Sequence, residues 1–152
     1  MVEVILSTIA IVVSVISIIV SAIAAHVANK QNLRLNKINM KARYYEKIFD
    51  EYLIRKIPQA RKYLRFAENR LVDSQHLSDV LSALLNDSLY FKYDDKEFYQ
   101  KLRHLIQEIE DYVLECGNRT YEQEDQAEVY IEIQRKLEKL YRYINDNYTG
   151  NE

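Results

Sequence analysis

The longest apolar segment of the chain covers residues 4–25 and contains no charged side chain. A helix rises by about 1.5 Å per residue, so a segment of this length spans roughly 33 Å, enough for the hydrocarbon core of a bilayer. The segment predicts one transmembrane helix within an anchor at residues 1–29. One alternative is a cleaved signal peptide, which typically has a basic start and an apolar core of about 7–15 residues. The other is a buried helix of a soluble domain.

Small side chains recur in this segment at alternating intervals of three and four residues. They are Ser7, Ala10, Ser14, Ser17, Ser21 and Ala24. This spacing places them on one helix face, and small residues mark faces where helix backbones approach each other in lipid. The pattern predicts self-association, with any pore lined by several copies of this face. The alternative is that each serine bonds to its own helix and faces lipid.

The same spacing continues beyond the apolar segment with larger side chains. These are Leu35, Ile38, Ala42, Tyr45, Phe49 and Tyr52. We expect one helix from about residue 4 to residue 56, bent or broken near Ile57 and Pro58. In water this stripe can pack on its own domain, on a second copy, or on both.

Helical periodicity continues through the rest of the chain. Apolar positions predict helices over residues 59–72 and 77–89, and an aromatic connector over residues 90–93. Asp94 is expected to cap a fourth helix at its start and Gly117 to cap its end. Thr120 and Gln123 resemble a capping box that opens the last helix.

The predicted fold class is therefore all-α, with a single N-terminal transmembrane helix that continues into a cytosolic helical bundle. We divide the chain into the anchor, a basic juxtamembrane helix at residues 30–57, a bundle at residues 58–148 and a frayed tail at residues 149–152. The chain holds two Gly and one Pro, which leaves few positions that would break helices.

Charge is distributed unevenly along the chain. Residues 30–57 hold eight basic and three acidic groups, whereas residues 58–152 hold 13 basic and 19 acidic groups. Basic residues close to a membrane stay in the cytoplasm, so we expect the N-terminus outside and the bundle inside, in the inner membrane of a cell. The residues expected to contact anionic lipid headgroups are Lys30, Arg34, Lys37, Lys41 and Arg43.

The sequence contains few residues in patterns that indicate catalysis or cofactor binding. We find no metal-binding motif and no glycine-rich phosphate loop, and we expect neither a metal nor another cofactor. Arg70 and His76 are the candidate catalytic pair, because a histidine can move a proton on a ribose hydroxyl and an arginine can stabilise a charged phosphate. The alternative is that Arg70 ends a helix and His76 lies in a loop.

The Arg70 and His76 spacing matches the Arg-x(4–6)-His signature of HEPN-type ribonucleases. Together with the short N-terminal span and the helical domain that follows it, the chain resembles the small membrane accessory proteins of type VI-B CRISPR systems. More broadly, it resembles single-span effectors of antiphage defence. The resemblance implies a HEPN-like bundle that assembles into a ring, with the spans forming a membrane pore.

We therefore expect a single-pass protein that self-associates and acts as an oligomeric membrane effector, through pore formation or depolarisation. The first alternative is a membrane-tethered adaptor that binds a cytosolic protein. The second is a metal-independent RNase, although we do not expect nucleic acid as a partner because the bundle is acidic.

Overall fold

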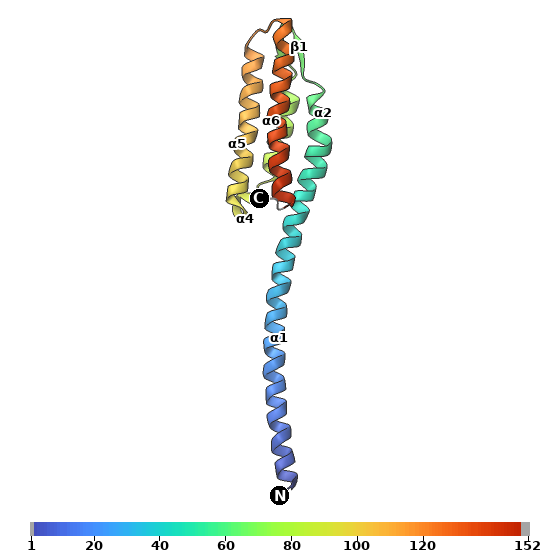
Figure 1. The fold of residues 1–152 in the computed structure, drawn as a ribbon, viewed down its shortest axis with the longest axis vertical. Helices are drawn as coiled ribbons and strands as arrows, with labels where there is room; N and C mark the ends of the chain where they lie inside the picture. The colour runs from blue at the N-terminus through green and yellow to red at the C-terminus, as the bar shows by residue number, and fades with distance from the viewer. Residues whose placement is uncertain (1, 150–152) are drawn as a thin grey trace. The chain divides into compact units, whose positions relative to one another are not determined.

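The computed structural model of the protein describes residues 2–149, without the side chains of residues 2–13 and 149 (Figure 1). The predicted tail at residues 149–152 thus lies almost wholly outside the described residues. The chain divides into two compact units, Met1–Lys41 and Ala42–Glu152. The division falls within the segment that we had assigned to a juxtamembrane helix, because side chains from Tyr45 onward enter a hydrophobic core.

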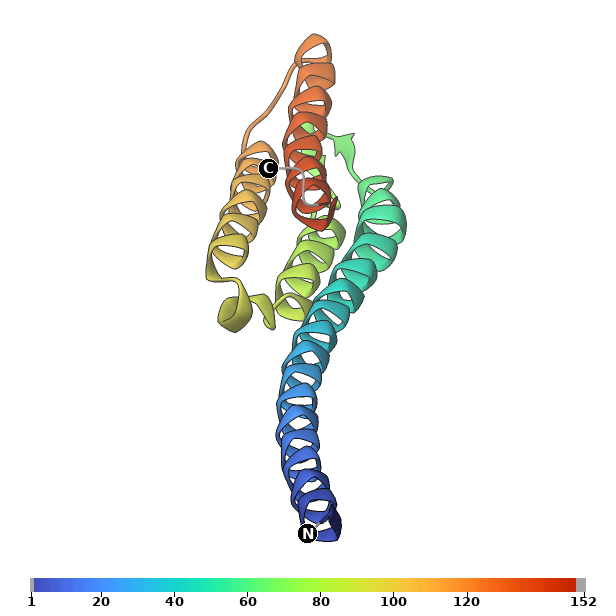
Figure 2. The ribbon, with the colours of Figure 1, turned by 60° about the horizontal axis from the view of Figure 1, so that its bottom comes forward.

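The described chain is mostly helical, as predicted, and its helices hold 84% of the 152 residues. The elements in order are α1 (Val2–Lys47), the π-helix η1 (Ile48–Lys56), α2 (Ile57–Arg61), β1 (Arg65–Ala67), β2 (Arg70–Val72), α3 (Gln75–Asp87), α4 (Phe91–Asp94), α5 (Lys96–Asn118) and α6 (Gln123–Thr149). In the second unit, α5 and α6 lie side by side, and α3 packs against α2, η1 and α5 (Figure 2).

The sequence predicted a bend or a break near Ile57 and Pro58, and the helix that begins in α1 is not broken there. It continues through η1 and α2 as far as Arg61. The N–H of Ile57 bonds to the carbonyl of Tyr52, five residues back, which is the pattern of a π-helix. Pro58 then occupies the first turn of α2 and supplies no N–H to the helix.

A β-hairpin replaces most of the helix predicted over residues 59–72. Strands β1 and β2 pair antiparallel, with Phe66 opposite Leu71. The two turn residues, Glu68 and Asn69, have φ angles of 51° and 64°. This left-handed conformation suits a two-residue hairpin turn, and asparagine adopts it readily. The prediction failed because buried apolar positions of a short hairpin can also fit a helical spacing.

The longer helices α3, α5 and α6 agree with the sequence in type and differ at their ends, whereas the predicted connector at residues 90–93 is largely the short helix α4. The cap of α5 is Asp95, whose side chain accepts a bond from the Phe98 N–H at 3.2 Å, and not Asp94 as predicted. Gly117 lies inside α5 and does not cap it, since the helix runs on to Asn118. The last helix begins at Gln123, two residues later than a cap at Thr120 would require.

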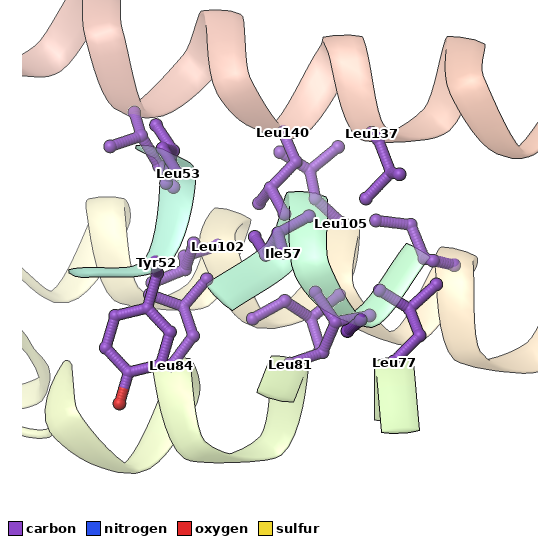
Figure 3. Packing of buried hydrophobic residues seen from close by; sticks show 14 of the residues in the cluster. Tyr52, Leu53, Ile57, Leu77, Leu81, Leu84, Leu102, Leu105, Leu137 and Leu140 are labelled. Atoms are coloured by element: carbon purple, nitrogen blue, oxygen red, sulfur yellow. The ribbon is translucent and has the colours of Figure 1, made fainter. Parts of the chain in front are cut away.

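One hydrophobic core fills the second unit (Figure 3). Leu53 of η1 and Ile57 of α2 contribute from one continuous segment, Leu81 from α3, Leu102 from α5 and Leu140 from α6. Each of these side chains is at most 2% exposed. Because four separate segments meet here, burial of the apolar face of each segment stabilises the bundle.

Candidate functional site

The first unit is a single helix with an uncovered surface. Every described side chain from residue 14 to residue 40 is exposed. The large apolar ones are 45% to 68% exposed and comprise Val15, Ile16, Ile18, Ile19, Val20, Ile23, Val27, Leu33, Leu35, Ile38 and Met40. Such a contiguous apolar surface normally marks a contact with lipid or with another protein.

Part of the predicted small-residue face lies on this surface. Ser14, Ser17, Ser21 and Ala24 are exposed, whereas the side chains of Ser7 and Ala10 fall outside the described residues. The first part of the predicted membrane span, residues 4–13, is therefore not described either. Among the residues that were described, no helix combines the length and the apolar composition that crossing a membrane requires.

The helix surface is hollowed on the side of Ala24. A shallow recess of about 440 Å³ is lined by Val20, Ile23, Ala24, Val27, Ala28 and Gln31. Ala24, Ala28 and Gln31 follow the three-and-four spacing of the predicted face. Small side chains between larger ones form the kind of groove into which ridges of a second helix fit.

The larger residues of the predicted face are divided between solvent and the bundle. Leu35, Ile38 and Ala42 are exposed. Tyr45 and Tyr52 are buried in the core of their own bundle, at 4% and 1% exposure, and Phe49 packs against that core. The sequence left open whether this stripe packs on its own domain, on a second copy, or on both. These three aromatic residues pack on the chain's own domain.

The basic residues expected at lipid headgroups lie on the same helix. Lys30, Arg34, Lys37 and Arg43 are exposed, and Lys41 is half-buried. Long basic side chains can extend to phosphate groups while their methylene stems cover apolar surface. Their exposure leaves them able to meet a charged surface.

A polar network that the sequence did not reveal joins the end of α1 and the middle of η1 to α3. The Tyr52 hydroxyl donates to Asp87 Oδ2 at 2.7 Å, and Lys47 Nζ lies 3.1 Å from the same oxygen. The hydrogen bond from Tyr52, followed by that from Lys47, holds the pKa of Asp87 below its usual value. Burial is the main cause that raises the pKa of Tyr52, so its hydroxyl remains a donor at neutral pH.

The candidate catalytic pair lies on two different elements. Arg70 is exposed on β2, opposite Ala67, and so does not end a helix. His76 is exposed in the first turn of α3, where its ring lies 4.4 Å from that of Tyr63. Within the described part of the chain, no hydrogen bond, ion pair or ring contact joins Arg70 to His76.

The described residues also contain no group of three or more His, Cys, Asp or Glu side chains that is arranged to hold a metal ion. Cys116 is buried, and its sulfur accepts a bond from the Tyr121 hydroxyl at 3.4 Å. This bond is the first cause that raises the pKa of Tyr121, to about 12. The thiol is thus part of the packing of α5, as is usual for a buried cysteine.

No protein-family model matches the chain, and we find no match among curated proteins or solved structures. The functional argument therefore rests on the residues and their arrangement.

Proposed function

We propose that this chain is a single-pass protein of the inner membrane whose copies associate through the first helix and act together as a membrane effector. In this proposal residues 4–25 cross the bilayer, the N-terminus lies outside and the bundle lies in the cytoplasm. The assembled helices permeabilise or depolarise the membrane. One helix per chain cannot enclose a pore, so the function requires several copies.

The recess around Ala24 is the observation that carries this proposal. It lies on a helix whose described side chains at residues 14–40 are all exposed. An apolar surface of this extent normally contacts lipid or another protein chain. The recess contains Ala28 as well as Ala24, which allows a second helix to approach closely. Association of identical helices through this face brings the exposed serines next to one another.

The distribution of charge along the first helix supports the proposal that residues 4–25 lie in a membrane. Residues 4–25 include no Asp, Glu, Lys or Arg, whereas residues 30–47 carry six basic side chains and one acidic side chain. An uncharged segment followed by a basic one fits a span whose second end faces the cytoplasm. The basic side chains then lie where anionic headgroups attract them.

Three measurements on the full chain test the proposal. Alkaline extraction of membranes from expressing cells should leave the protein in the pellet, and its release would reject the membrane span. Light scattering of the detergent-purified protein should give a particle of several chains, and a strict monomer would reject self-association. A voltage-sensitive dye should report depolarisation on expression, and an unchanged potential would reject the effector activity.

The adaptor function is a second candidate because the bundle has its own core. All of the described core residues lie at Tyr45 or later in the chain. The bundle therefore needs no packing from the first unit to bury its apolar residues, and it can bind a cytosolic partner while the helix serves as a tether. Specific capture of one partner by the full chain, combined with a normal membrane potential, would favour the adaptor.

A further inference from the structure

A groove opens on the surface of the bundle between α2 and α6. Its volume is about 410 Å³, within the range of small-molecule sites. Pro58 contributes to one wall, and Leu137 and Tyr141 contribute to the other. A neighbouring hollow of about 440 Å³ shares Pro58 and Arg61 with it.

Two arginines line the groove without an acidic partner. Arg61 and Arg142 are exposed, and neither forms an ion pair with another described residue. By contrast, Arg65 and Arg135 are both paired with carboxylates elsewhere in the bundle. Two guanidinium groups beside one cavity, in a domain with an acidic excess, create a local site for an anion.

One acid, Glu138, also lines the groove. Glu138 accepts a hydrogen bond from Gln134 Nε2 at 3.0 Å. This bond orients the Gln134 amide so that its oxygen is the buried atom, and that oxygen has no hydrogen-bond partner among the described residues. Only an N–H or O–H on the body of a ligand can satisfy this oxygen, because phosphate oxygens are themselves acceptors.

Tyr141 provides the flat apolar surface of the groove. Its ring is half-buried, and its hydroxyl is held by the carbonyl of Leu53 at 2.6 Å. Burial raises the pKa of Tyr141 to about 12, and the nearby charge of Arg61 opposes that rise. The ring is therefore fixed, neutral and close to Arg61, which suits a ligand with an apolar body and a charged end.

We propose that this groove binds a small organic phosphate, with Arg61 and Arg142 binding the phosphate and with Pro58 and Tyr141 packing against the body of the ligand. Phosphate fits better than a single carboxylate, because its oxygens can accept bonds from two guanidinium groups at once. The same chemistry is present in a nucleotide and in a phospholipid headgroup. The groove lies wholly within the bundle, so the binding does not depend on the membrane function proposed above.

Calorimetric titration of the purified full chain tests the site with three probes: AMP, dihexanoyl phosphatidate and adenosine. We expect one of the two phosphates to bind and adenosine, which lacks the phosphate, not to bind. Binding of AMP identifies a nucleotide site, and binding of the phosphatidate identifies a headgroup site. Arg61→Ala and Arg142→Ala should each weaken binding by roughly tenfold or more, as expected for loss of a charge-assisted hydrogen bond.

The matched control is Arg103→Ala, which removes an exposed arginine of α5 outside the groove. It should bind the probe as tightly as the unmodified protein. If Arg61→Ala fails to fold, Arg61→Lys retains the charge and should still weaken binding, because lysine cannot form the paired bonds of a guanidinium. The proposal is overturned if neither phosphate binds, if adenosine binds equally well, or if the Arg103 variant loses as much affinity as the groove variants.

Discussion

The Tyr141 hydroxyl donates a 2.6 Å hydrogen bond to the carbonyl oxygen of Leu53, 88 residues earlier in the chain. In an α-helix this carbonyl would bond to the N–H of Ile57, but that N–H bonds to Tyr52 instead. In a π-helix it would bond to residue 58, which is a proline and has no N–H. Tyr141 therefore supplies the donor that the helix itself lacks.

This relationship predicts the effect of removing one hydroxyl. Tyr141→Phe should lower the free energy of unfolding by about 1–3 kcal/mol, because the Leu53 carbonyl loses its donor. Urea denaturation measures the change. Tyr93→Phe is the matched control, since Tyr93 is 85% exposed, and it should change stability by less than about 0.5 kcal/mol.

A double-mutant cycle tests whether Pro58 is the reason that the hydroxyl is needed. Pro58→Ala restores an N–H that can bond to the Leu53 carbonyl. We expect Tyr141→Phe to be less destabilising in the Pro58→Ala background than in the unmodified protein. Equal effects in the two backgrounds would show that Tyr141 and Pro58 act independently.

The carboxylate of Asp87 gives a prediction about pH. Its pKa is lowered in the folded state, first by the bond from Tyr52, so its contribution to stability is present above the unfolded-state pKa near 3.8 and is lost as pH falls through the lower folded value. Tyr52→Phe should remove about 1 kcal/mol at pH 7, a modest figure because Asp87 is partly exposed. The variant and the parent should differ less at pH 2 than at pH 7 in urea denaturation.

The recess on α1 predicts how association responds to added volume. Ala24→Leu fills the recess and should weaken self-association by roughly tenfold, which light scattering across a dilution series detects. Ala22→Leu adds the same volume and apolarity to an exposed position of the same helix outside the recess. The control should keep the parental size, and a loss of association in both variants would show that the recess is not the contact.

The positions of Arg70 and His76 predict the behaviour of their alanine variants. His76→Ala should destabilise the bundle by about 0.5–1 kcal/mol through loss of its contact with Tyr63, whereas Arg70→Ala should have little effect. We expect no RNA cleavage by the purified parent. Cleavage that both substitutions abolish would instead establish the pair as catalytic.

Sequence patterns predicted the long helices well and their ends less well. The buried faces of α5 and α6 could be predicted because burial follows the helical period. Phe98, Leu102 and Ile106 of α5 are examples. The caps at Asp94 and Thr120 were placed one or two residues away from their observed positions. Several polar residues near each end can serve as a cap, and packing selects among them.

The sequence by itself determined that the chain is helical, that residues 4–25 carry no charge and are followed by a basic segment, and which side chains of the long helices are apolar. These properties depend on residues three or four positions apart. Only the tertiary structure decided that residues 65–72 form a hairpin, that Tyr45 and Tyr52 belong to the bundle core, and that Arg61 and Arg142 share a groove. The hairpin pairs residues three to seven positions apart in extended strands, and contacts between residues far apart in the chain decide the other two features. Helical periodicity carries no record of either kind of contact.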